Sequence, residues 1–330
     1  MRNTFRNSII ITGILVICTR IYAQDLSSIT ISDVSRIEKI LADDDMQGRK
    51  IFTTGIKKAA GFIAKEFAEA GLKPLPGCTD YYQSFSMTGT GSAKTLDNIV
   101  GMIPGKIKPD QCVIFSAHYD HLGTGKPDAH GDSIYNGAND DASGTTAVIT
   151  LAKYFGRLNN NQRTVIFVAF TAEESGHWGS SYLSERINPD EIMAMFNIEM
   201  IGTESKWGKN SAYVTGYDKS DIGSILQKNS KNSLFRFYPD PYPGEELFLR
   251  SDNTPFAQKG VPAHTISTAK MGSDPYYHKP GDEIETLDLN NMTGIIRAIA
   301  LGASSIIAGE DEPVRLKRNN YLSLKASIVP

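Results

Sequence analysis

Side chains that bind metal ions or transfer protons follow several probable strands of this chain, in five short stretches spread over about 160 residues. The five stretches are His118-Tyr119-Asp120, Asn139-Asp140-Asp141, Ala172-Glu173-Glu174, Asn197-Ile198-Glu199 and Tyr277-His278. In open α/β sheets, ligands bind outside the carboxyl ends of the strands, so one sheet edge can collect residues that are distant in sequence. Histidines and carboxylates that converge in this way are typical ligands of one or two Zn²⁺ ions. The sequence therefore predicts a metal site at the edge of an α/β sheet.

The hydrophobic pattern supports such a fold. Helical spacing of apolar residues predicts helices over residues 31–41, 56–71, 144–158, 221–229 and 290–308, with Ser143 as a cap of the third. Alternating or continuous apolar runs predict strands over residues 82–87, 98–103, 112–117, 164–171, 194–200 and 212–215. Strands that alternate with helices predict a mixed, mostly parallel sheet with helices on both faces, which is a three-layer α/β sandwich. Residues 204–254 are rich in Gly, Ser, Asn and Pro, and we expect them to form loops around the site rather than a second domain.

Residues 1–23 have the pattern of a secretory signal peptide. Arg2 and Arg6 precede an apolar run over residues 9–18, and Ala23 is a small residue at a plausible cleavage point. The apolar run is shorter than the roughly 20 residues of a membrane span. We therefore expect export to the periplasm or the extracellular space, without stable membrane insertion. A lipoprotein anchor at Cys18 is the alternative, although Ile17 is bulky for the position before such a cysteine.

The remaining chain is expected to form one domain over residues 24–309, followed by a tail over residues 310–330. Loss of the leader leaves 31 Lys and Arg against 37 Asp and Glu, so the chain lacks the basic surface of a nucleic-acid-binding protein. Outside the leader the cysteines are Cys78 and Cys112, which are too few for a cysteine-based zinc site. Whether these two form a disulfide, and how many copies of the chain associate, are left open.

The pair Glu173-Glu174 carries the clearest chemical signal. Adjacent acids after a buried strand would repel each other unless a cation or a shared proton lay between them. Neighbouring side chains at a strand end point in different directions, so one can bind metal while the other acts as a general base. A solvated charge pair is the alternative, but the apolar run over residues 165–170 argues against it.

Three other motifs fit the same chemistry. A metal-bound imidazole usually donates its second N–H to a carboxylate, and Asp120 lies two residues after His118. Asp140 precedes a predicted helix, where an acid can act as a helix cap, but its carboxylate could also bridge two metal ions. His278 lies in a proline-bounded loop, beside a tyrosine, Tyr277, whose hydroxyl could stabilise an oxyanion.

The other motifs of enzyme chemistry are weak or missing. His121, His130, His177 and His264 lack a comparable context and are not predicted to bind metal, although His121 could lie in the wall of the pocket. There is no G-x-S-x-G elbow, no P-loop and no dinucleotide-binding fingerprint. Hydrolysis by a metal-activated water is therefore favoured over nucleophilic or cofactor-based catalysis.

These motifs, in this order, resemble peptidase family M28, the zinc peptidases with two co-catalytic metal ions. The resemblance extends from about Gly48 to Gly302. Matching segments are Gly48-Arg49, residues 98–101, 116–123, 139–144, 172–180 and 197–202, Ser251-Asp252 and His278. The family has a twisted, mixed eight-stranded sheet between helices, with the metals at the strand ends, which agrees with the pattern above.

The resemblance implies a role for each matching residue. It implies that two Zn²⁺ ions are bound by His118 and Glu199 on one side and by Glu174 and His278 on the other, with Asp140 bridging them. It implies that Glu173 is the general base, Asp120 the partner of His118, and Tyr277 the oxyanion-stabilising group of some members. Two positions depart from the family pattern. Glu199 stands where aspartate is usual, which adds one methylene to the ligand on the His118 side, and Asn253 stands where histidine is common.

The predicted function is that of an exported metallo-aminopeptidase, which hydrolyses N-terminal peptide bonds with a zinc-activated water. Its partners would be peptides with a free N-terminus. The alternatives are a single-zinc enzyme similar to glutaminyl cyclases, a carboxypeptidase of the same family, and a non-catalytic binding domain. The full set of ligand-type residues favours two metals over one. The preferred N-terminal residue and the identity of the native metal are left open.

Overall fold

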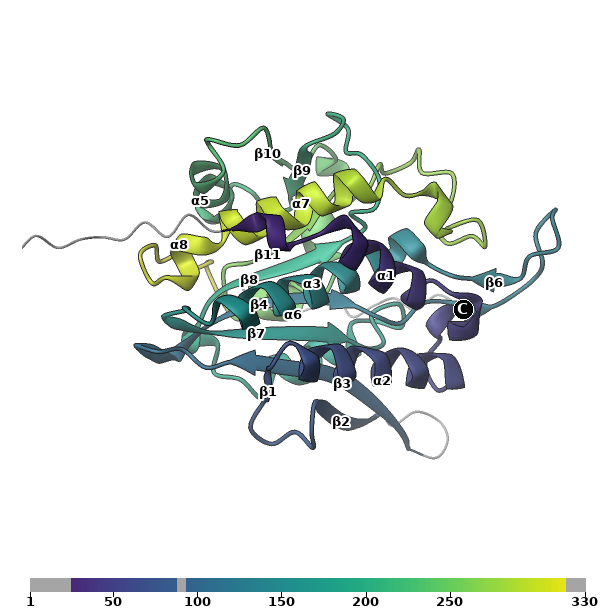
Figure 1. Ribbon diagram of the computed structural model, residues 1–330, viewed down its shortest axis with the longest axis horizontal. Coiled ribbons are helices and arrows are strands. Elements are labelled where there is room, and N and C mark those ends of the chain that lie inside the picture. The colour runs from purple at the N-terminus through teal and green to yellow at the C-terminus, as the bar shows by residue number, and fades with distance from the viewer. Residues whose placement is uncertain (1–24, 88–92, 319–330) are drawn as a thin grey trace, which may run out of the picture.

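A nine-stranded mixed sheet forms the centre of the chain, and helices cover it (Figure 1). The computed structural model describes residues 25–87 and 93–318, so the predicted signal peptide at residues 1–23 lies outside the described residues. The strand order is β1-β3-β7-β4-β8-β11-β9-β10, and β2 also pairs with β3. The strands of this sheet are β1 (Lys73–Pro74), β2 (Tyr82–Met87), β3 (Lys94–Ile103), β4 (Lys108–His118), β7 (Arg163–Phe170), β8 (Ile192–Glu199), β9 (Ser211–Val214), β10 (Arg236–Pro239) and β11 (Ala263–Ser267). A separate two-stranded ribbon joins β5 (Gly123–Thr124) to β6 (Ile134–Tyr135).

The four central strands β7, β4, β8 and β11 run parallel to one another. Antiparallel strands flank them, because β3 pairs with β7 and β9 pairs with β11 in the opposite direction. The carboxyl ends of the four parallel strands therefore meet at one edge of the sheet. This arrangement confirms the predicted mixed sheet with a parallel centre.

Helices pack on both faces of the sheet. They are α1 (Ile31–Leu41), α2 (Thr54–Glu69), α3 (Ser143–Leu158), α4 (Trp178–Ser184), α5 (Ile222–Asn229), α6 (Thr254–Gln258), α7 (Leu289–Gly302) and α8 (Ser304–Ile307). In Figure 1, α1, α2, α3 and α7 lie on the face that is turned toward the viewer. Val113 and Phe115 of β4 belong to the core on the α3 side, whereas Ile114 packs on the opposite side with Leu183 of α4 and Phe256 of α6. This alternation along β4 is the period-2 pattern of a strand that is buried on both faces.

Most predicted elements agree with the structure to within a few residues. The predicted helix over residues 290–308 was wrong in one respect, because α7 ends at Gly302 and the short helix α8 follows it. Strands β10 and β11 and helices α4 and α6 were not predicted, since each has five residues or fewer or is rich in Gly and Ser. Residues 204–254 hold loops together with β9, α5 and β10, and the two strands belong to the central sheet. Among residues 25–87 and 93–318, no helix has both the length and the apolar composition that crossing a membrane would require.

Candidate metal centre and active site

The parallel centre of the sheet brings the predicted site residues to one edge. His118 is the last residue of β4, Glu199 is the last residue of β8, and Glu173 and Glu174 follow β7. Asp140 lies between β6 and α3, and His278 lies in the loop after β11. Residues that are up to about 160 positions apart in the sequence are thus side by side.

Asp140 lies between two histidines. Its Oδ1 is 3.2 Å from Nε2 of His118, and its Oδ2 is 3.2 Å from Nε2 of His278. A second carboxylate completes each side. Glu199 Oε1 is 3.7 Å from Nε2 of His118, and Glu174 Oε2 is 3.3 Å from Nε2 of His278. The site therefore has two halves that share Asp140: the His118 half (His118, Asp140, Glu199) and the His278 half (His278, Asp140, Glu174).

The chemistry of this donor set fits two Zn²⁺-type ions. Nε2 of His118 is buried and makes no hydrogen bond, although carboxylate oxygens surround it. A buried polar atom without a partner is costly, and a cation at this point would remove the cost. Imidazole nitrogens and carboxylate oxygens, three protein ligands to an ion, are what zinc takes in catalytic sites, and each half offers three such residues. One nitrogen or oxygen atom from each of His121, Asp140 and Glu174 also lies within 4.8 Å of the others, as it does for His118, Asp141 and Glu199.

The histidines and carboxylates of the site shift each other's pKa values. Burial by itself would lower the pKa of His278, but the carboxylates of Asp140 and Glu174 outweigh it and raise this pKa to about 10. Burial by itself would raise the pKa of Asp140, but His118 and His278 hold it well below its usual value. Positive charge beside these carboxylates is therefore favourable, and a bound cation would supply it.

Asp141 and Asp282 hold the Asp140 segment by accepting backbone hydrogen bonds. Asp141 accepts hydrogen bonds from the backbone N–H groups of Met200 at 2.9 Å and Gly144 at 3.1 Å, and a longer one at 3.3 Å from the N–H of His118. Asp282 accepts hydrogen bonds from the N–H groups of Asn139 at 2.8 Å and Asp140 at 3.0 Å. Burial raises the pKa of Asp282 to about 7. Sequence reasoning missed Asp282, because nothing in its local sequence shows that it contacts a loop 142 residues earlier.

Arg49 connects two backbone segments of the same region through hydrogen bonds. Its buried guanidinium donates to the backbone carbonyls of Tyr119, Asn136 and Gly137, which tie the segment after β4 to the segment before Asp140. Gly48 precedes it with φ +63, and a Cβ there would lie 2.4 Å from the carbonyl oxygen of Gly123. In the pair Gly48-Arg49, which matches the family pattern, the glycine lets its backbone lie close to that of Gly123, and the arginine makes buried hydrogen bonds.

Asp120 contacts both His118 and the base candidate, in a way that differs from the simplest prediction. Nδ1 of His118 is 3.1 Å from the backbone carbonyl oxygen of Asp120 and 3.9 Å from its carboxylate. The nearer partner that orients the imidazole is therefore the carbonyl. The carboxylate of Asp120 instead accepts the backbone N–H of Glu173 at 3.0 Å, and burial raises the pKa of this carboxylate to about 6.

The Glu173 side chain lies in a tight turn after β7. Ala172, with φ +59, and His177, with φ +57, both adopt the left-handed conformation, which turns the chain back at the strand end. Burial raises the pKa of Glu173 well above its usual value, with a contribution from the neighbouring carboxylates of Glu199 and Asp252. A buried carboxylate holds a proton more tightly than an exposed one, which suits it to accept a proton during catalysis.

The contacts of Glu199, which stands where the family usually has aspartate, explain how the site accommodates the longer side chain. Oε2 of Glu199 accepts a hydrogen bond from the hydroxyl of Ser251, and the amide of Asn197 lies 3.4 Å from the same oxygen. The extra methylene of glutamate thus lets one carboxylate face His118 and Ser251 together. Asn253, the other departure from the family pattern, is buried. Its amide donates to the carbonyl of Phe248 at 2.9 Å and accepts from the hydroxyl of Thr265 at 2.9 Å, which are structural contacts.

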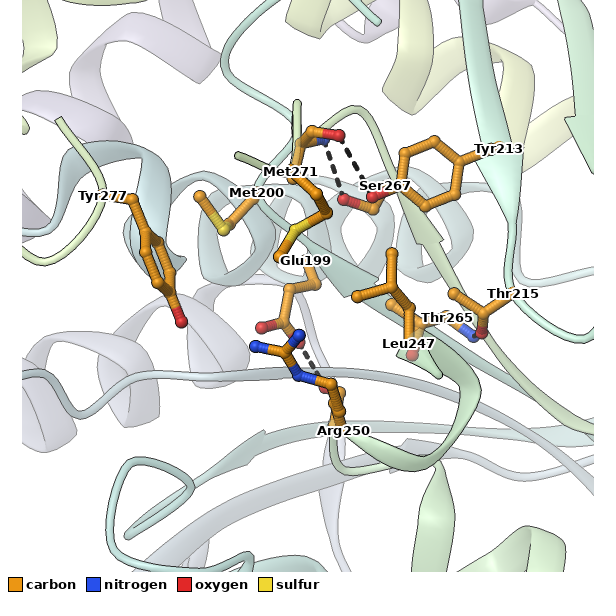
Figure 2. Close-up of a pocket in the computed structure, with 12 residues that line it drawn as sticks. Glu199, Met200, Tyr213, Thr215, Leu247, Arg250, Thr265, Ser267, Met271 and Tyr277 are labelled. Carbon is orange, nitrogen blue, oxygen red and sulfur yellow. Dashed lines mark hydrogen bonds between the residues drawn. The ribbon is translucent and has the colours of Figure 1, made fainter. Parts of the chain in front are cut away.

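A small pocket opens beside Glu199, and Figure 2 shows the side chains that surround it. Its lining combines apolar side chains with hydroxyl groups and a single guanidinium: Glu199, Met200, Tyr213, Thr215, Leu247, Arg250, Ser251, Thr265, Ser267, Ala269, Met271 and Tyr277. The Tyr277 ring stacks on the His278 ring, with 3.9 Å between their centroids, and its hydroxyl points into the pocket (Figure 2). Tyr277 is therefore placed between the His278 half and the pocket.

The remaining histidines differ in their surroundings. His121 is buried, and its Nδ1 is 2.9 Å from Oε1 of Glu174, so this residue belongs to the surroundings of the site although the sequence predicted at most a place in the pocket wall. His264 contacts Ser220 and the carbonyl of Thr215 through its two nitrogens, and burial lowers its pKa to about 4, which fits a structural residue. His130 is exposed on the β5–β6 connection.

Relatives of known type share this fold and sequence pattern. The chain is 26% identical to aminopeptidase YwaD of Bacillus subtilis over 297 residues, which cover 86% of this chain and 57% of YwaD. The chain thus spans only a little over half the length of that relative. A zinc aminopeptidase from Bacillus subtilis superimposes with a TM-score of 0.69 at 15% identity, covering 86% of this chain and 97% of that one. The glutaminyl cyclase of Porphyromonas gingivalis superimposes with a TM-score of 0.68 at 14% identity, covering 84% and 99%.

The two structural comparisons establish the fold but do not separate the two activities, because an aminopeptidase and a glutaminyl cyclase match equally well. The family model for peptidase family M28 matches residues 98–302. This range covers most of the chain and includes both halves of the site. The chain belongs to peptidase family M28.

Proposed function

We propose that this chain is a metallo-aminopeptidase that removes N-terminal residues from peptides. The observation that carries the proposal is the pair of histidine–carboxylate halves around Asp140, with Glu173 beside them. His118 and Glu199 would hold one Zn²⁺, Glu174 and His278 would hold the other, and Asp140 would contribute one oxygen to each. When bound, such ions lower the pKa of a water molecule and polarise the scissile carbonyl.

The protein residues would then move the protons. Glu173 would accept a proton from the attacking water and return it to the leaving amine, because its burial raises its proton affinity and Asp120 fixes its backbone. The hydroxyl of Tyr277 would donate a hydrogen bond to the developing oxyanion. The side chain of the N-terminal residue would enter the pocket beside Glu199. We also propose that the chain is exported through the predicted signal peptide at residues 1–23.

Hydrolysis of a panel of aminoacyl reporter amides tests the proposal. The zinc-loaded protein should cleave amides with a free α-amino group and leave the matching N-acetylated amides intact. A chelator should abolish the activity, and added Zn²⁺ should restore it. Cleavage of the N-acetylated series at an equal rate would contradict an aminopeptidase.

The second candidate is a glutaminyl cyclase, which the structural similarity to the Porphyromonas gingivalis enzyme favours. Peptides with N-terminal glutamine separate the two functions. A cyclase would release ammonia and leave a blocked peptide of unchanged length, whereas an aminopeptidase would release free glutamine. The presence of His118 with a buried, unpartnered Nε2 supports a second metal and hence the aminopeptidase.

A further inference from the structure

His177 contacts the proposed general base directly. Its Nε2 lies 3.1 Å from Oε1 of Glu173, and the Glu173 side chain is only 10% exposed. His177 itself is one-quarter exposed. One oxygen of the Glu173 carboxylate is therefore engaged by an imidazole, and the other remains for a proton from water.

The turn that contains His177 does not need an imidazole to hold its shape. Backbone hydrogen bonds close it: the N–H groups of Gly176 and His177 both donate to the carbonyl of Glu173, at 2.8 and 3.1 Å, and the N–H of Trp178 donates to the carbonyl of Ala172 at 3.2 Å. None of these hydrogen bonds uses the His177 side chain.

The backbone at His177 would in fact favour a different residue. Its φ of +57 lies in the left-handed region, which glycine adopts without a steric penalty. Histidine is tolerated there at a small energetic cost. The backbone therefore does not call for histidine here, and the contact with the Glu173 carboxylate points to a role for the imidazole itself.

We propose that His177 is a positioning residue for Glu173. The inference rests on the proposed function, in which Glu173 is the general base. The 3.1 Å approach of Nε2 of His177 to Oε1 of Glu173 restricts the rotation of the carboxylate and leaves Oε2 for the reacting groups. A carboxylate that is free to rotate would present the wrong lone pair or the wrong oxygen for part of the time. His177 thus supports catalysis without touching the substrate or the metal ligands.

The substitution H177G tests this role, because glycine removes the imidazole and suits the left-handed backbone. We expect kcat for aminoacyl amide hydrolysis to fall about tenfold, as for loss of other residues that orient a reacting group, while KM changes less than about twofold. Bound zinc and the melting temperature of the metal-free protein should stay at the wild-type values. H177Q keeps a side-chain N–H donor and should recover part of the lost kcat. H130G, the same change at an exposed histidine, should leave kcat unchanged.

A second measurement needs no activity. In the metal-free protein, the imidazole ¹⁵N resonances of His177 should shift when Glu173 is replaced in E173Q, while those of His130 should not. The proposal is overturned by any of three results: H177G has the wild-type kcat, H177Q has the same kcat as H177G, or the His177 resonances do not shift in E173Q. Failure of the proposed function looks different, since wild-type protein would then hydrolyse no aminoacyl amide at all.

Discussion

The two halves of the site offer similar ligands but are built differently. In the His118 half, the histidine ends strand β4 and the carboxylate ends strand β8, and the His118 side chain is 1% exposed. In the His278 half, the histidine lies on a loop, in the left-handed conformation, and its side chain is 35% exposed. The sheet thus fixes the His118 half, whereas the histidine of the other half lies on a loop, where its ring stacks on that of Tyr277.

The difference suggests separate consequences for stability and for access. Changes in the His118 half disturb a buried region, where Asp141 and Arg49 connect the strand ends through backbone hydrogen bonds. Changes in the His278 half disturb a loop that borders the pocket. Glu173 belongs to neither half, so it should affect chemistry alone.

The largest expected effect comes from E173Q, because this substitution removes the proton acceptor and keeps the shape of the side chain. We expect kcat to fall about a thousandfold, within the range for loss of a general base. Elemental analysis should find the same zinc content as in the wild type. Undiminished activity would contradict the mechanism, and loss of zinc would show that Glu173 belongs to one of the halves.

The pair H118A and H278A tests the comparison itself. Each variant should lose about one equivalent of bound zinc by elemental analysis. H118A should also lower the stability of the metal-free protein, by about 1–3 kcal/mol, because it leaves a cavity and unpaired carboxylates in a buried region. H278A should lose less, since its site is open to water. Equal losses in chemical denaturation would mean that the two halves are not built differently.

E199D sharpens the comparison within the His118 half. The shorter side chain would withdraw from the Ser251 hydroxyl or from His118, because it cannot reach both from the same backbone position. Zinc affinity of this half should fall about tenfold, while the affinity of the His278 half stays unchanged. S251A, which keeps the glutamate and removes its hydrogen bond, should produce a smaller loss. Competition with a chromogenic chelator measures the zinc affinity of both variants. If the weaker of the two zinc affinities were the same in S251A as in the wild type, the Ser251 contact would be irrelevant.

A pH effect of smaller size should come from Glu38, a buried residue of α1 that accepts a hydrogen bond from Thr146. Burial raises the pKa of Glu38 to about 8 from its ordinary value of 4.5, against the opposing effects of its hydrogen bond from Thr146 and the charge of Arg49. The folded chain therefore keeps the proton between these values while the unfolded chain loses it. This contribution to stability is full below about pH 4.5 and is lost as the pH rises through about 8.

The variant E38Q should remove that contribution. Denaturation of the metal-free protein at several pH values should show that the wild type loses stability relative to E38Q between pH 5 and 8. The effect is at most about tenfold in the folding equilibrium per pH unit, because a single proton is involved. Parallel stability curves for the two proteins would contradict the assignment.

The sequence predicted the sheet centre and the ligand-type residues because both depend on local pattern. The apolar runs that became β4, β7 and β8 are continuous; His118 and Glu199 end β4 and β8, and Glu173 lies three residues after the end of β7. Contacts between distant segments were not predictable in this way. Asp282 accepts hydrogen bonds from the Asp140 segment, and the Asp120 carboxylate binds the backbone of Glu173 rather than lying closest to His118. Such pairings depend on where loops meet in three dimensions.

The most direct test of the account is anomalous diffraction at the zinc absorption edge from crystals of zinc-loaded E173Q, which should bind metal without turning over substrate. The account predicts two zinc ions, one on each side of Asp140, with His118 and Glu199 around the first and His278 and Glu174 around the second. A single zinc ion in the His278 half, with His118 left without metal at saturating zinc, would contradict it.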